Sequence, residues 1–290
     1  MTAVCWRRVT RGLGILVGTA LCLQAVVGTA FAQGGSGGPN QGAISFKGGV
    51  DVPSVYVFRG IVREQDPQFT MQPWGELGFA LRSGGNGAMR DVKVSVGVWN
   101  SLQTGSSGSN GFSQRLHYEE DFYSVLSLGL AGRFTLAAAF TAYTSPNVMF
   151  DTVKEASVRL SHESWLRPYG LAAFDIGKDG FDLGRRKGTY VEVGVAPSHA
   201  LGRLTLAVPA RLGVSGKDYY EHPITGVDHR FGFAEVGGIA TWPLNAAGGR
   251  FGSWDLHGGA RVLALGDTTK FLNDGKGTKV VMTAGLGVRY

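Results

Sequence analysis

The residues with the clearest chemical potential are His162 and Ser164, which stand two apart in the run Ser161-His162-Glu163-Ser164. If this run is a β-strand, alternate side chains share a face, and the imidazole lies beside the hydroxyl. A histidine next to a serine is the arrangement of a general base and a nucleophile. The same face is apolar from Ala156 to Leu160 and would meet lipid. The alternative is an interfacial histidine beside Trp165.

This pair is similar to the His-x-Ser-Asn motif of outer-membrane phospholipase A and of the lipid A deacylase. The resemblance implies hydrolysis of a lipid ester by His162 and Ser164. Two features depart from it: Trp165 replaces the asparagine, and the topology set out below puts the pair at the periplasmic end, whereas those enzymes work near the outer leaflet. Lipid hydrolysis is therefore the third of three hypotheses, and the chain is predicted not to be an enzyme.

Metal binding is a weaker possibility. Only His222, Asp228 and His229 share a predicted loop, and the other histidines are dispersed. Imidazole and carboxylate groups can bind a metal at such a spacing, although a solvated loop is the commoner structure. No phosphate-binding loop precedes a helix. The sequence predicts no metal and no cofactor.

Charged residues at alternate strand positions form a larger set. The expected strands place eight basic and nine acidic side chains in one interior, which predicts either a polar channel with weak ion preference or paired charges that plug the bore. The pore-lining candidates among them are Lys47, Arg59, Glu76, Lys93, Arg159, Glu192, Arg211, Glu235 and Arg261. The other members are Asp51, Glu119, Asp121, Glu155, Asp175, Asp255, Lys279 and Arg289.

Arg59 stands where the first strand should meet the first loop. Its guanidinium could hold that loop by bidentate pairing with Asp66 or Glu64. It could instead act at a constriction and attract anionic solutes. Gly60 and Pro67 favour the first reading, because both are typical of shaped loops.

The elements that must position these residues are long strands of period two. The last one alternates Val280, Met282, Ala284, Leu286 and Val288 with small or polar residues, and it ends in an aromatic residue, as the closing strand of an outer-membrane barrel does. A soluble barrel would put its large apolar residues inside, but here the minority face is small and polar. Twelve strands are expected, at 43–58, 70–81, 91–100, 117–130, 133–143, 152–164, 167–176, 189–196, 203–214, 230–242, 253–265 and 278–290.

The connections between these strands alternate in length. Longer ones are expected outside the cell, at 59–69, 101–116, 144–151, 177–188, 215–229 and 266–277. Mostly shorter ones are expected in the periplasm, at 82–90, 131–132, 165–166, 197–202 and 243–252. Trp165, Trp242, Phe251 and Trp254 gather near the short-turn side, as an interfacial aromatic girdle would. The fold class is therefore an all-β, transmembrane, up-and-down antiparallel barrel.

The N-terminal segment predicts the compartment. Arg7, Arg8 and Arg11 precede an uncharged stretch that closes on Ala30-Phe31-Ala32, which indicates a secretory signal peptide at 1–32, exported through the Sec pathway. A retained membrane anchor at 12–31 is the alternative. A flexible segment at 33–42 and a single barrel domain at 43–290 would follow. Both cysteines, at positions 5 and 22, lie in the signal, so the mature barrel would carry no disulfide.

The run from Val55 to Ile61, Val-Tyr-Val-Phe-Arg-Gly-Ile, followed by Gln65 to Phe69, resembles the Tyr-x-Phe-Arg-Gly signature of the TorF-type porin family. Weaker likenesses lie at 118–123 and 142–147. The resemblance implies a bacterial outer-membrane barrel of undefined transport role, and it brings no catalytic residues.

The favoured hypothesis is a porin in the outer membrane of a Gram-negative envelope, passing small polar solutes by passive diffusion along a mixed-charge lumen. A structural or adhesive barrel with ligand-binding loops at 101–116 and 215–229 is the alternative. Expected partners are outer-membrane lipid, the solutes, and the barrel-assembly machinery through the strand ending in Tyr290. Removing the signal takes the formal net charge from +6 to +3, too mild to suggest nucleic acid.

Overall fold

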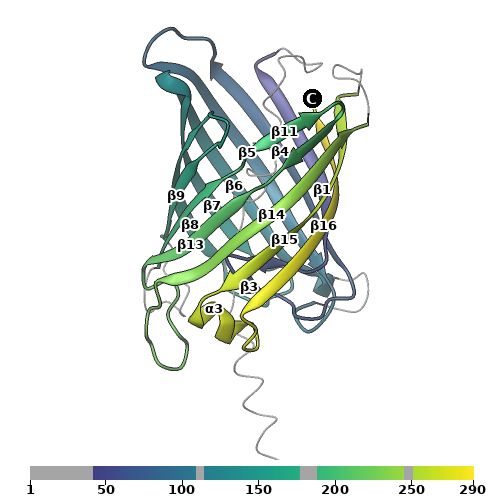
Figure 1. The fold of residues 1–290 in the computed structure, drawn as a ribbon, viewed down its shortest axis with the longest axis vertical. Coiled ribbons are helices and arrows are strands. Elements are labelled where there is room, and N and C mark those ends of the chain that lie inside the picture. The colour runs from purple at the N-terminus through teal and green to yellow at the C-terminus, as the bar shows by residue number, and fades with distance from the viewer. Residues whose placement is uncertain (1–41, 109–113, 177–187, 245–250) are drawn as a thin grey trace, which may run out of the picture.

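Twelve antiparallel strands form a closed barrel in the computed structural model (Figure 1), which describes residues 42–108, 114–176, 188–244 and 251–290. The proposed signal peptide and residues 33–41 lie outside this part of the chain. In ring order the wall strands are β1 (Ile44–Pro53), β4 (Thr70–Arg82), β5 (Met89–Gln103), β6 (His117–Leu130), β7 (Phe134–Thr144), β8 (Val153–His162), β9 (Tyr169–Asp175), β10 (Thr189–Val195), β13 (Ala210–Lys217), β14 (Phe231–Pro243), β15 (Ser253–Leu265) and β16 (Thr278–Arg289). The predicted all-β class and strand number are confirmed.

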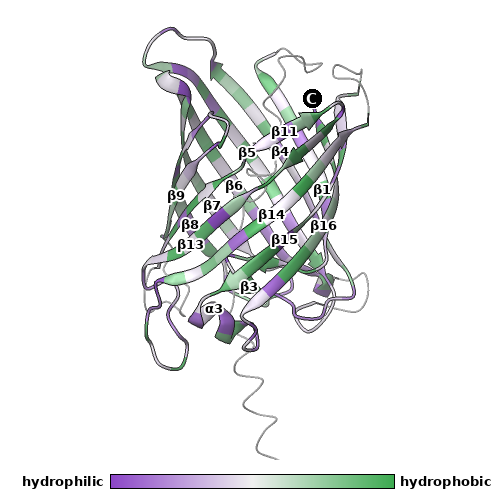
Figure 2. Ribbon diagram, viewed as in Figure 1, coloured by the Kyte–Doolittle hydropathy of each residue, from purple (hydrophilic) through white to green (hydrophobic). Residues whose placement is uncertain are grey.

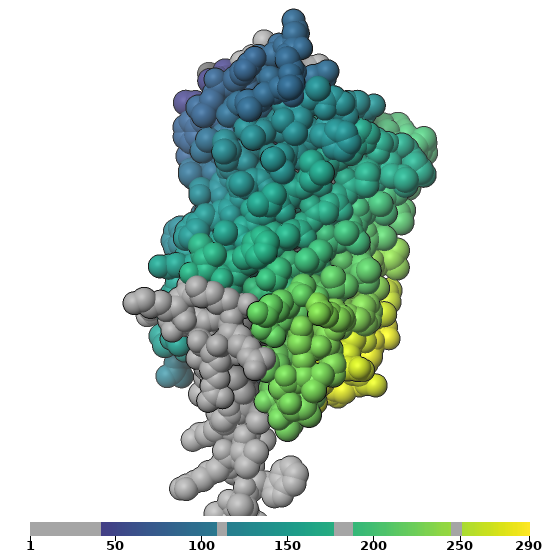
Figure 3. Space-filling model, turned by 90° about the vertical axis from the view of Figure 1, so that its left-hand side faces the viewer, coloured from purple at the N-terminus to yellow at the C-terminus, as the bar shows by residue number. Residues whose placement is uncertain are grey.

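Each wall strand pairs with its neighbours in sequence, and β1 closes the ring against β16 from Lys47 opposite Arg289 to Pro53 opposite Thr283. The strands run as tilted bands side by side on the face seen in Figure 3. A closed ring leaves no open sheet edge, so every wall strand has a partner on both sides for most of its length. Among the described residues, no helix is long and apolar enough to cross a membrane.

The outer face of the barrel is apolar. Val96, Leu206 and Met282 are among its exposed side chains, while residues of the other parity on the same strands, such as Ser95 and Val281, are buried. Figure 2 shows the resulting alternation of hydrophobic and hydrophilic positions along the strands. This is the outside-in pattern of a barrel whose solvent is hydrocarbon.

An aromatic belt lies at the short-turn end, where the chain terminates. Trp165 and Phe251 are 72% and 79% exposed, and Trp242 and Trp254 are also exposed. Amphipathic rings at this height suit the interface between lipid and water. The predicted girdle is therefore present on the barrel surface.

Glycines on the inner face make room for large lumen side chains. A Cβ added at Gly97 would lie 2.3 Å from the ring of Tyr123, and one added at Gly285 would lie 2.3 Å from Nε2 of His257. Both glycines belong to wall strands whose neighbours carry these large groups across them. The heavy use of glycine thus follows from a crowded bore.

The first predicted strand, 43–58, is wrong in its second half. β1 ends at Pro53, and the chain then enters the bore as a hairpin of β2 (Val57–Phe58) and β3 (Ile61–Val62). The expected external loop at 59–69 is therefore partly internal. The reason is visible in Val55 to Phe58, which are apolar at both parities, whereas a wall strand here needs one polar face.

Smaller corrections concern the strand ends. The predicted strand 203–214 is divided into β12 (Leu204–Ala207) and β13, because Pro209 cannot donate a ladder hydrogen bond. The predicted turn 197–202 is mostly a strand, β11 (Ser198–Leu201), which pairs with β12. The predicted loop 266–277 contains a short helix, α3 (Asp267–Leu272). Single 3-10 turns, η1 (Gln114–Leu116) and η2 (Ala131–Arg133), precede β6 and β7.

Candidate functional site

The hairpin of residues 54–66, called the lumen hairpin below, crosses the bore at the loop end of the barrel. Its two-residue turn is Arg59-Gly60, with φ of +42° and +81°. Positive φ at both central residues is the geometry that matches the twist of a tight hairpin. Gly60 adopts it freely, but Arg59 is strained by about 1 kcal/mol or more. Contacts of the arginine side chain must offset that strain.

Arg59 is clamped to the opposite wall by Glu155 of β8. Nη1 and Nη2 each donate to a carboxylate oxygen of Glu155 at 2.9 Å, so the pair is bidentate. Nη1 also donates to the hydroxyl of Tyr219 at 2.9 Å. Tyr143 donates to Glu155 at 3.1 Å. Both members of the pair are almost fully buried, at 6% and 3% side-chain exposure.

The charges of Arg59 and Glu155 stabilise each other in the buried clamp. Burial by itself would lower the pKa of Arg59, but Glu155, with Tyr219 and Tyr143, raises it well above its ordinary value. The Arg59 guanidinium also lies 4.0 Å from the centroid of the Tyr190 ring, over its π face. Sequence reasoning foresaw a bidentate partner for Arg59 but named Asp66 or Glu64, which is wrong. A partner 96 residues away leaves no local signal.

Apolar side chains pack on both faces of the lumen hairpin. Val55, Val57 and Val62 join a cluster with Tyr190, Tyr219, Tyr220 and Phe233. On the other face, Tyr56 and Phe58 join Trp99, Tyr118 and Tyr143. Because these residues come from strands all around the ring, the loop end of the bore is filled by a side-chain core.

A second polar anchor comes from the residue after α3. The Asn273 side chain accepts from the N–H of Val62 at 2.8 Å and donates to the carbonyl of Gly60 at 2.7 Å. It also donates to the carbonyl of Thr269 at 2.6 Å, which fixes it to the helix. Asn273 therefore ties the hairpin backbone to the last external loop.

Glu64, on the return arm of the hairpin, holds the loop that follows β5. Its Oε2 accepts from the N–H and hydroxyl of Ser107 at 2.8 Å and 3.0 Å, and from the hydroxyl of Ser106 at 3.0 Å. Burial would raise the pKa of Glu64, but these bonds and one from the N–H of Asp66 hold the pKa below its ordinary value. The carboxylate is thus bound as an anion.

Between the hairpin and the short turns, the bore is lined with charged side chains. Arg211 donates from Nε and Nη2 to the two carboxylate oxygens of Glu235, each at 2.9 Å, and from Nη1 to Glu192 at 3.4 Å. Arg261 lies 3.7 Å from Glu235. Arg159 stacks 3.8 Å above the ring centroid of Tyr169. Five of the predicted pore-lining residues thus form one ladder along β8 to β15.

The facing wall carries a second charged group. Lys93 lies 3.7 Å from Glu76, whose register partner on β1 is Lys47. The Lys93 side chain is 32% exposed, so this part of the bore is open to solvent. These three are also predicted lumen positions, and the structure places all of them on the inner face.

His257 is a lumen residue that sequence reasoning missed. Its Nε2 lies 2.7 Å from Asp51 and its Nδ1 lies 3.1 Å from Asp255, which also accepts from Arg289 at 3.1 Å. The strand parity of Asp255 and Arg261 would have found it, because His257 lies between them on the same face. The contact with Asp51 spans β16 above Gly285, which has no side chain to block it.

The remaining predicted lumen charges lie near the hairpin. Glu119, Asp121 and Asp175 are buried, with exposures of 5% or less, and Lys279 is half-buried on β16. Their side chains mainly pack around the hairpin and do not line the open part of the bore. The expected charged interior therefore has two regions, a filled one at the loop end and a partly solvated one at the short-turn end.

The proposed His162 and Ser164 pair is not held on one strand face. β8 ends at His162, and Ser164 lies in the following turn, so strand alternation does not align the two side chains. The His162 ring packs on Phe134 with 4.6 Å between centroids. This geometry fits the interfacial histidine better than the catalytic base.

The His222 loop has other contacts. Asp228 accepts from the hydroxyl of Ser215 at 2.7 Å, and His229 lies 3.1 Å from the hydroxyl of Thr268. Within the described ranges, no group of three histidine, cysteine, aspartate or glutamate side chains could hold a metal ion.

Comparison with solved structures finds outer-membrane β-barrel proteins of similar fold. The chain is similar to the NanC porin (12% identity over 85% of this chain and 99% of that one, TM-score 0.41). It is also similar to outer membrane phospholipase A from Escherichia coli (11%, 83% and 89%, TM-score 0.44) and to an outer membrane channel from Pseudomonas putida F1 (10%, 87% and 97%, TM-score 0.47). No protein-family model and no curated protein matches the chain.

Proposed function

We propose that this chain is an outer-membrane channel for small polar solutes, with the lumen hairpin as its gate. The observation that carries the proposal is the partly solvated, mixed-charge region below the hairpin. Its acidic and basic groups are paired across strands, as Lys93 is with Glu76, so neither sign dominates. Such a lining would pass small polar solutes with weak ion preference.

The gate is proposed from the way the hairpin is held. Its tip is held by directional contacts, namely the Arg59 clamp and the Asn273 bonds, in addition to the two apolar clusters. Contacts of this kind are lost together when the hairpin moves, which is how a bistable element behaves. The likeness of residues 55–61 to the TorF-type porins is in keeping with this proposal. Export through the Sec pathway and passive diffusion are parts of it.

Removing the hairpin tests the proposal. A variant with residues 55–65 replaced by a short Gly-Ser linker keeps β1 and β4 adjacent and opens the loop end. In planar bilayers it should show stepwise, ohmic conductance well above that of the unaltered protein. The matched control replaces the exposed residues 223–227 in the same way and should leave conductance unchanged.

The competing function is a closed structural or adhesive barrel, which the filled loop end favours. Folding of each variant is checked by its heat-dependent mobility shift in gels. A folded hairpin-less barrel that stays silent in the bilayer would contradict the channel and support the structural barrel.

A further inference from the structure

The barrel wall has a gap beside the point where β1 leaves it. Pairing of β1 with β4 ends at Asp51 opposite Gln72. Two positions further on, this register would join Pro53 to Thr70, but Pro53 has no N–H to donate. At Ser54 the chain turns into the bore. β16 and β4 then stand on either side of a missing wall strand.

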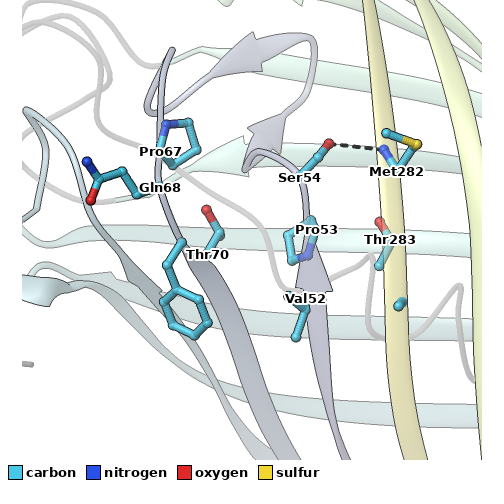
Figure 4. A pocket seen from close by; sticks show the side chains of 10 residues that line it. Val52, Pro53, Ser54, Pro67, Gln68, Thr70, Met282 and Thr283 are labelled. Atoms are coloured by element: carbon cyan, nitrogen blue, oxygen red, sulfur yellow. Dashed lines mark hydrogen bonds between the residues drawn. The ribbon is translucent and has the colours of Figure 1, made fainter. Parts of the chain in front are cut away.

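Ser54 covers the β16 side of this gap. Its N–H donates to the carbonyl of Met282 at 2.7 Å, and its hydroxyl accepts from the N–H of Met282 at 3.1 Å. Figure 4 shows this contact on one side of a hollow, with Pro67, Gln68 and Thr70 on the other. The hollow has a volume of about 380 Å³.

The hollow opens on the lipid-facing stripe. Val52, Met282 and Ala284 line it, and all three are exposed on the outer face of the barrel. It is therefore continuous with the surface that contacts hydrocarbon, and an apolar group is its natural occupant.

Polar residues complete the lining, namely Ser54, Gln68, Thr70 and Thr283. The Thr70 oxygen is buried, so a molecule in the hollow would not contact it.

We propose that the hollow binds one acyl chain of a bilayer lipid, with the chain against Val52 and Met282. The site does not depend on the channel proposal, because a silent barrel would have the same gap. It requires only that the apolar outer face lies in a membrane.

Photo-crosslinking tests the site. The full protein is reconstituted in phosphatidylcholine vesicles that contain a phosphatidylcholine with a diazirine in one acyl chain, and crosslinked positions are mapped by mass spectrometry. Crosslinks are expected on Phe69 and Thr70 as well as on the outer stripe. Crosslinks confined to outward residues all around the barrel, with none on 67–70, would overturn the proposal.

Two variants sharpen the test. Ala284→Trp fills the hollow and should abolish the crosslinks at 67–70, whereas Ala138→Trp, an exposed position on β7 away from the hollow, should retain them. Crosslinks at 67–70 that survive Ala284→Trp in a folded barrel would contradict the assigned occupant.

Discussion

At the residue scale, the central feature is a buried ion pair between the turn of the lumen hairpin and a distant wall strand, β8. Replacing both charges by apolar groups can be neutral, but removing one partner leaves the other charged in a dry site. Arg59 cannot lose its proton, so the cost of losing Glu155 falls entirely on the folded state.

Glu155→Gln should therefore destabilise the docked hairpin by about 3–5 kcal/mol. The expected result is a lower denaturant midpoint and faster hydrogen exchange at residues 55–62. Lys154→Gln, an exposed neighbour on the same strand, is the control and should change little. An unaltered exchange pattern in Glu155→Gln would show that the apolar clusters alone hold the hairpin.

The residue types of the site were largely predictable, but their pairing was not. Period-two alternation assigns Arg211 and Glu235 to the lumen, because parity depends only on local sequence. The Arg59 partner depends on ring closure, which brings β1 and β8 to opposite walls. The residues around Arg59 in the sequence do not indicate which distant residue will pair with it.

At the element scale, Glu64 links the hairpin to the loop after β5, and its pKa gives this link a pH dependence. A lowered pKa in the folded state means that the stabilisation is present above the ordinary value of 4.5 and is lost as the pH falls below it. We expect the amides of residues 104–107 to have lower protection factors at pH 3.5 than at pH 6, once the slower intrinsic exchange at low pH is taken into account.

Glu64→Gln supplies the comparison. The amide cannot ionise, so the protection factors at 104–107 should already be low at pH 6 and should change less between the two pH values. A variant with the same pH response as the unaltered protein would assign the effect to another group.

Element boundaries were predicted well where turns were short and poorly around prolines. The twelve wall strands follow from alternation, and most limits agree within a few residues. Pro53 and Pro209 end or divide strands that alternation alone would continue, because a missing N–H interrupts the ladder without changing the pattern of side chains. The lumen hairpin was missed for a different reason, because the run from Val55 to Phe58, apolar at both parities, resembles a continuation of the first strand.

At the scale of the whole molecule, the C-terminal residue closes the ring. The N–H of Tyr290 donates to the carbonyl of Phe46, and the N–H of Phe46 donates to the carbonyl of Tyr290, both at 2.8 Å. These bonds use only the backbone. The exposed side chain of Tyr290 is free for the proposed role in recognition by the assembly machinery.

Tyr290→Ala should therefore refold in detergent like the unaltered protein but accumulate less in the outer membrane of cells. Tyr290→Phe keeps the aromatic ring and should accumulate normally. Both are read from the heat-shifted band in membrane fractions. Loss of refolding in detergent would assign Tyr290 a role in stability instead.

The position of the hairpin directly after β1 also bears on how the barrel forms. Its contacts join residues 96, 211 and 213 positions apart, and β1 meets β16 only when the chain is nearly complete. Pairings of such high contact order are slow, because the entropy of closing the loop is lost before the contacts form. The hairpin follows β1 directly, so the segment that pairs with β16 also leads into the bore. Pairing of the first strand with the last and burial of the hairpin therefore become a single late kinetic step.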